Sequence, residues 1–95
     1  MGKLLAHICV KDGMCKDFIK YATAVKEHAV QEAGCLLYEV YQLADNKNEF
    51  YLLEEWRSEE YFIRHLASSH ARAFENRVKE IQAEELQPIL WEKIV

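Results

Sequence analysis

The sequence predicts an α+β fold with the ferredoxin-like β-α-β-β-α-β order, formed by one domain over residues 1–95. Short segments rich in strand formers alternate with two segments of helical periodicity. A chain of 95 residues has enough material for one hydrophobic core but not for two. Hydrophobic residues are 51% of the chain and charged residues 29%, a composition that excludes a disordered protein.

The first half of the predicted fold is a strand followed by a helix. Residues 4–10 are uncharged and partly β-branched, and the turn-forming sequence Lys11-Asp12-Gly13 comes next. From about residue 14 to residue 32, apolar side chains recur at steps of three and four, which indicates an amphipathic helix. Gly34 lies just past the end of this helix, where a glycine commonly ends one.

The second half is predicted to be a β-hairpin, a helix and a last strand. Residues 35–43 and 49–56 are rich in strand formers, and the polar turn 44–48 joins them. Ser58 is the expected N-cap of the next helix, because its hydroxyl can accept from a free backbone N–H. This helix runs to about residue 85, with Ser68-Ser69 as a candidate bend. After Pro88, residues 89–95 form the last strand.

Both faces of the predicted sheet are apolar. Two helices can cover only one face of a four-stranded sheet, so the other face of a monomer should be polar. At roughly 25 cal/mol per Å², burying an apolar face of several hundred Å² would stabilise an assembly considerably. The sequence therefore predicts a homodimer that packs sheet against sheet with two-fold symmetry. The first strand shows the pattern, with Leu4, Ala6, Ile8 and Val10 on one side and Leu5, His7 and Cys9 on the other.

Charge and cysteine content exclude several classes of protein. The net charge of −4 argues against a nucleic-acid partner, which would need a local excess of lysine and arginine. The uncharged run of residues 4–10, which no other run exceeds, is too short to span a bilayer and does not resemble a signal peptide. Three cysteines without a C-x-x-C pair are typical of the reducing cytoplasm, and they leave open a metal ligand or reactive thiol. We therefore expect a soluble, cytoplasmic protein without a membrane partner.

The layer between the helices and the sheet is the expected place for a small-molecule pocket. His65 and His70 are the candidate catalytic residues, and His7 and Trp56 are candidates for the pocket. On an unbroken helix, side chains five residues apart point about 140° away from each other, so a bend would be needed to turn both histidines toward the sheet. Glu54 is expected to meet solvent at a strand end. The chain has no H-x-H or H-E-x-x-H spacing, so no metal site is predicted.

Three stretches of the chain carry a resemblance to a known family: AHICVKDG, EAGCLLYEVYQ and FYLLEEWRSEEYFIRHLASSHARAF. They resemble the antibiotic biosynthesis monooxygenase family, most specifically over residues 55–70 and the following Phe74. The resemblance implies a dimeric α/β barrel of two ferredoxin-like protomers. It also places Trp56 at the strand-end tryptophan of cofactor-free oxygenases, and matches His65 and His70 to the H-x-x-x-x-H pattern of the quinol monooxygenase branch.

The resemblance implies that a quinol or related electron-rich aromatic reacts with O₂ without a metal, flavin or other cofactor. A phenol with a pKa of about 10 is hardly ionised at neutral pH, so a base must take its proton before the anion can pass an electron to O₂. His65 or His70 would be that base. The substrate would be bound by His7, Trp56, Phe62, Leu66 and Phe74.

Two other functions stay open at this point. A dimer of this kind could bind an apolar small molecule without catalysis. The same base acting on an enol-forming substrate would isomerise a phosphorylated, autoinducer-like ketone. The cations near the second helical region that could bind its phosphate are Arg57, Arg64, Arg72 and Arg77.

Overall fold

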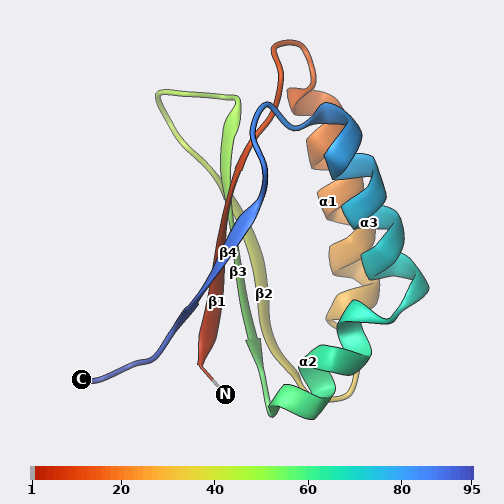
Figure 1. Cartoon of the computed structure of the whole chain (residues 1–95), viewed down its shortest axis with the longest axis vertical. Helices are drawn as coiled ribbons and strands as arrows, with labels where there is room; N and C mark the ends of the chain where they lie inside the picture. The colour runs from red at the N-terminus through yellow and green to blue at the C-terminus, as the bar shows by residue number, and fades with distance from the viewer. Residues whose placement is uncertain (1) are drawn as a thin grey trace.

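The structure is a computed structural model that describes residues 2–95. Its four strands form one antiparallel sheet in the order β2-β3-β1-β4, and its three helices lie on a single face of that sheet (Figure 1). The ferredoxin-like fold is therefore confirmed, with the second helical region divided in two. The elements are β1 (Lys3–Cys9), α1 (Cys15–Ala29), β2 (Cys35–Gln42), β3 (Glu49–Trp56), α2 (Glu59–Leu66), α3 (Ser69–Ile81) and β4 (Gln87–Trp91).

Two elements end earlier than the sequence predicts. The first helix stops at Ala29 instead of residue 32, because the backbone N–H groups of Gln31 and Glu32 bond three residues back in tighter turns. The last helix stops at Ile81 instead of near residue 85, because Gln82 is extended and forms an isolated bridge with Val10. This bridge returns the chain to the sheet, so β4 covers residues 87–91 and not 89–95.

The candidate bend at Ser68-Ser69 is a complete break between α2 and α3. Ser68 has an extended backbone, and its hydroxyl accepts a hydrogen bond from the backbone N–H of Ala71 at 3.2 Å, which makes it the N-cap of α3. Ser58 precedes α2 as predicted, but its side chain makes no capping bond. The carboxylates of Glu59 and Glu60 stabilise that end through the helix dipole instead.

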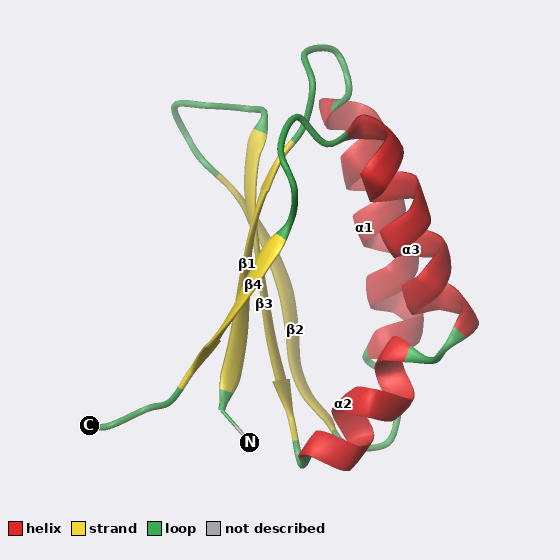
Figure 2. Ribbon diagram, viewed as in Figure 1, coloured by secondary structure: helices red, strands yellow, loops and turns green. Residues whose placement is uncertain are grey.

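The hydrophobic core lies between the sheet and the helices, and the opposite face of the sheet is uncovered (Figure 2). The sheet contributes one parity of side chains to the core, including Ile8, Phe50 and Leu52, and α1 contributes Phe18 and Val25. The side chains at the alternate positions form what we call the open face. Slightly more than half of them are apolar, and the rest are Lys3, His7, Glu39, Glu49, Glu55 and Gln87. Its apolar members include Leu5, Leu37, Tyr41, Tyr51, Leu53, Ile89 and Trp91.

No helix among residues 2–95 is both long enough and apolar enough to cross a membrane.

We expect Gly34→Ala to destabilise the fold more than Gly13→Ala. Both glycines have a positive φ, +84° and +86°, where an L-residue costs roughly 1–2 kcal/mol. A Cβ at Gly34 would also lie 2.7 Å from Cδ1 of Tyr61, whereas a Cβ at Gly13 would meet no atom within 4 Å. Urea unfolding of the two variants gives the loss in the free energy of unfolding for each. Because both variants pay the cost of the positive φ, the difference between the two losses is the cost of the contact with Tyr61. Equal losses would show that the Tyr61 ring moves aside freely.

Candidate functional site

The break between α2 and α3 brings His65 and His70 to one carboxylate oxygen. Nδ1 of His65 lies 2.6 Å from Oε2 of Glu32, and Nε2 of His70 lies 3.0 Å from the same oxygen. Because an ionised carboxylate only accepts, we assign both nitrogens as donors. Glu32 comes from the turn after α1, and the sequence analysis did not single it out as a site residue.

His65 is the most enclosed of these side chains, with 3% of its surface exposed. Its ring stacks on Trp56 at 4.6 Å and meets the edge of Tyr38 at 5.8 Å, both measured between ring centroids. With Nδ1 donating to Glu32, Nε2 is the acceptor nitrogen of the neutral ring. Nε2 lies 3.6 Å from Oε1 of Glu54, so a proton gained at Nε2 would produce a cation between two carboxylates.

Glu54 is buried, contrary to the expectation that it meets solvent at a strand end. Its parity explains the correction, because it points to the same face as Phe50, Leu52 and Trp56. Oε1 accepts a hydrogen bond from Nε1 of Trp56 at 3.0 Å. Burial raises the pKa of this carboxyl above its ordinary value, and the Trp56 hydrogen bond and the His65 charge only partly oppose that rise.

A cavity of about 630 Å³ opens next to His65, between the sheet and helices α2 and α3. His65, Phe62, Leu66 and Phe74 line it, together with Tyr38 and Glu54. Its wall is mainly apolar, as expected of a site for an aromatic molecule. The charged and polar side chains Glu75, Lys79, Gln82 and Glu85 also border it, and all four are at least partly exposed.

Three predicted site residues lie outside the wall of this cavity. Trp56 is buried behind the His65 ring, so it packs against that ring without lining the cavity beside it. His70 contacts Glu32 and stacks on His28 at 5.2 Å, also away from the wall. His7 is on the open face, because strand residues alternate and Ala6 and Ile8 take the helix-facing positions. The expectation that His7 belongs to this pocket is therefore wrong.

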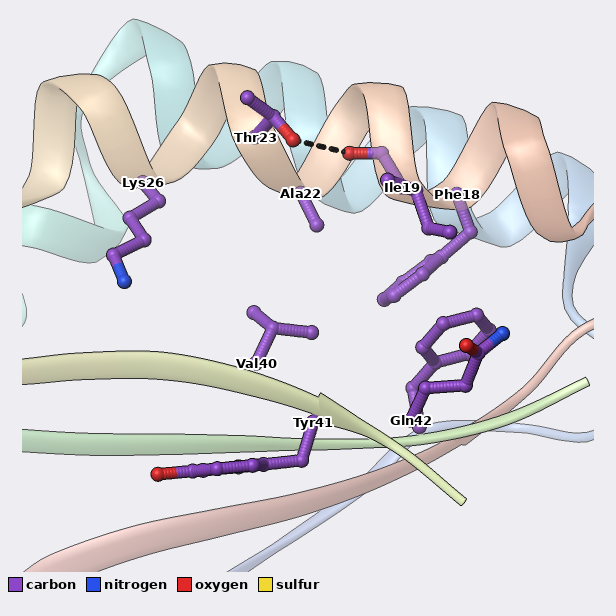
Figure 3. Close-up of a pocket in the computed structure, with 9 residues that line it drawn as sticks. Phe18, Ile19, Ala22, Thr23, Lys26, Val40, Tyr41 and Gln42 are labelled. Carbon is purple, nitrogen blue, oxygen red and sulfur yellow. Dashed lines mark hydrogen bonds between the residues drawn. The ribbon is translucent and has the colours of Figure 1, made fainter. Parts of the chain in front are cut away.

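A second, smaller hollow of about 310 Å³ lies between α1 and β2 (Figure 3). Phe18, Ala22 and Val40 face it, with Lys26 above and Tyr41 and Gln42 along the strand. No histidine or carboxylate lines it among the described residues. It therefore offers a surface for packing but no group suited to move a proton at neutral pH.

Glu32, His65 and His70 are also of the residue types that bind transition metals, and their ligand atoms lie within 4.8 Å of one another. The Glu32 contacts of 2.6 and 3.0 Å are nevertheless those of charge-assisted hydrogen bonds. This geometry favours hydrogen bonds over metal coordination as the interaction that joins the three side chains.

We expect the stability of the protein to fall as the pH rises from the unfolded value of Glu54, about 4.5, through its raised folded pKa. In that window the folded state retains a proton that the unfolded state has lost, so each increase in pH favours unfolding. Glu54→Gln keeps an acceptor for Trp56 and removes the charge. Urea titrations across this pH range should show the fall in the wild type and a flatter profile in the variant. Identical profiles would contradict the assignment.

Both a family sequence pattern and a single known protein match most of the chain. Residues 1–77 match the sequence pattern of the family described as antibiotic biosynthesis monooxygenase. The chain is 27% identical over 89 residues to the "Putative monooxygenase YcnE" of Bacillus subtilis, covering 94% of each protein.

Solved structures share the fold over almost the entire chain. A protein titled as a putative antibiotic biosynthesis monooxygenase from Nitrosomonas europaea superposes with a TM-score of 0.94 at 19% identity, covering 100% of both chains. A conserved protein from Methanosarcina mazei superposes with a TM-score of 0.90 at 26% identity, covering 96% of this chain and 90% of the other.

Proposed function

The chain belongs to the antibiotic biosynthesis monooxygenase family, and we propose that it uses His65 as a base to prepare a quinol or related electron-rich phenol for reaction with O₂, without a metal or organic cofactor. The observation that carries the proposal is the placement of His65. Its ring lines an apolar cavity, its Nδ1 is held by Glu32, and its Nε2 can accept a proton.

The base step follows from this placement. A phenol with a pKa of about 10 gives up its proton reluctantly at neutral pH, and a positioned base contributes typically 10²- to 10⁴-fold. Nε2 of His65 would take the proton, and the Glu32 and Glu54 carboxylates on either side would stabilise the imidazolium. Phe62, Leu66 and Phe74 would hold the aromatic ring and keep water away from the anion.

The substrate itself can supply all the electrons. The phenolate passes one electron to O₂, and the resulting radical pair combines at a ring carbon to form a peroxide. Loss of water then leaves a carbonyl, so that a hydroquinone and O₂ give a hydroxyquinone and water. One oxygen atom enters the product and the other leaves as water, and no external reductant is consumed.

Phosphate binding finds less support in this cavity. Lys79 is the one cation among the described residues that line it, and three glutamates line it as well. Arg64 is engaged by Glu60 at 2.7 Å, and Arg77 lies over the ring of Tyr21. Arg57 and Arg72 are exposed, and neither lines the cavity. Among the described residues the cavity wall therefore has no cluster of cations for the phosphate of a ketone substrate.

Oxygen uptake with a reduced hydroquinone tests the proposal. We expect uptake above the uncatalysed autoxidation rate, and one labelled oxygen atom in the hydroxyquinone when labelled O₂ is supplied. Quinol binding without uptake would replace the proposal with the non-catalytic binding function. Hydrogen peroxide and unlabelled quinone as the products would show an oxidase.

We also propose that the protein is a homodimer that pairs the open faces of two copies. Leu53, Leu5 and Ile89 are neighbours across β3, β1 and β4 on this face, and no part of residues 2–95 covers them. A contiguous apolar row of this kind is typical of an interface. Glu39 and Glu55 lie at its margins, where a polar rim is expected.

We expect Leu53→Glu to convert the dimer to a monomer, because it places a charge in the middle of the proposed interface. Light scattering coupled to size exclusion would report the single-chain mass of 11.2 kDa for this variant and twice that mass for the wild type. Ile63→Glu is the matched control, since Ile63 is exposed on α2 and should tolerate the same change. A wild type of single-chain mass at micromolar concentration would refute the dimer.

A further inference from the structure

Three side chains of metal-binding type converge on the open face, away from the cavity. His7 and Cys9 are two residues apart on β1, so both point to this face, and Glu49 of β3 is paired directly with Cys9. The His7 ring stacks on Tyr51 with 4.8 Å between centroids, which fixes its orientation. The cluster thus rests on two paired strands and not on a loop.

The spacing of the three ligand atoms matches the coordination shell of a small metal ion. Nε2 of His7 lies 3.4 Å from Oε1 of Glu49, and Sγ of Cys9 lies 3.5 Å from that nitrogen and 3.6 Å from that oxygen. Zinc bonds of about 2.0 to 2.3 Å at the tetrahedral angle separate ligand atoms by about 3.3 to 3.7 Å. As a thiol, Cys9 donates a hydrogen bond to Oε1 of Glu49. The His7–Glu49 distance, in contrast, is long for a hydrogen bond and fits the range of a shared metal ion.

The carboxylate of Glu49 places negative charge beside Cys9, because its Oε1 lies 3.6 Å from the Cys9 sulfur. A divalent ion would offset this charge, and a water molecule would complete a fourth position on the ion.

From this geometry we propose that His7, Cys9 and Glu49 form a binding site for a divalent transition-metal ion, with zinc as the expected occupant. Sulfur, nitrogen and oxygen ligands together suit zinc, whereas magnesium and calcium prefer oxygen alone. The site lies on the opposite face of the sheet from His65, so it goes beyond the proposed oxygenation and does not depend on it. Within the proposed dimer it would lie at or beside the interface.

Cobalt titration of the metal-free, full-length protein tests the site, because cobalt bound to a thiolate gives a charge-transfer band in the near ultraviolet. We expect a band that saturates at one ion per chain and is removed by one equivalent of zinc. Cys9→Ser should abolish it, while Cys15→Ser, the matched control on α1, should keep it. Glu49→Gln retains the thiol and should weaken zinc binding at least about tenfold.

Two results would overturn the proposal. One is the absence of a saturable cobalt band in the wild-type protein. The other is an unchanged band and an unchanged zinc affinity in Cys9→Ser, which would place any bound ion elsewhere. Circular dichroism of each variant confirms that the fold is retained, and Glu49→Gln remains an independent test if Cys9→Ser does not fold.

Discussion

His65→Ala is expected to lower kcat/KM for a quinol substrate by about 10²- to 10⁴-fold, the usual contribution of a positioned base. The loss should fall mainly on kcat, because Phe62, Leu66 and Phe74 still line the cavity and bind the aromatic ring. The alanine leaves space where the ring was, so added imidazole should restore part of the activity. Oxygen uptake measured without imidazole gives the loss of activity in the variant, and uptake measured with imidazole gives the part that is restored.

Two other histidines serve as controls for His65. His28 is exposed and contacts the cluster only by stacking on His70, so His28→Ala should leave the rate unchanged. His70 contacts Glu32 but does not line the cavity, so His70→Ala should cost much less than His65→Ala. A larger loss in His70→Ala than in His65→Ala would transfer the role of base to His70.

The fold could be predicted from the sequence because each element carries its own local signal. Alternating apolar residues mark the strands, three- and four-residue spacing marks the helices, and Gly34 marks the end of the first helix by its need for a positive φ. Ser68 also signalled the break between α2 and α3, since serine is a strong N-cap. These signals depend only on residues close together in the chain.

The site was only partly predictable, because its decisive contacts join residues that are distant in the sequence. Glu32 and His65 are 33 residues apart, and nothing near Glu32 indicates that it meets a histidine. Glu54 did carry a signal, since it shares the parity of buried residues on β3. His7 was assigned to the wrong face because both parities of β1 are apolar, so the sequence alone could not show which one faces the helices.

Glu32→Gln is expected to lower kcat by about 10²- to 10⁴-fold while KM changes little. The larger value, about 10⁴-fold, is the loss of kcat in serine proteases when the aspartate that hydrogen-bonds the catalytic histidine is replaced by asparagine. Glu32 does not line the cavity, so in the proposed reaction it would act on the substrate only through His65, as a positioning residue. An amide can hold His65 by donating to Nδ1, which would leave the proton on Nε2 and remove the acceptor that the phenol needs.

The form of the rate loss distinguishes this positioning role from a general loss of structure. Glu32→Asp keeps the charge on a shorter side chain, so it should recover part of the activity that Glu32→Gln loses. If Glu32→Gln instead raised KM at unchanged kcat, Glu32 would contribute to binding alone, and the orientation of His65 would have to come from Trp56 and Tyr38.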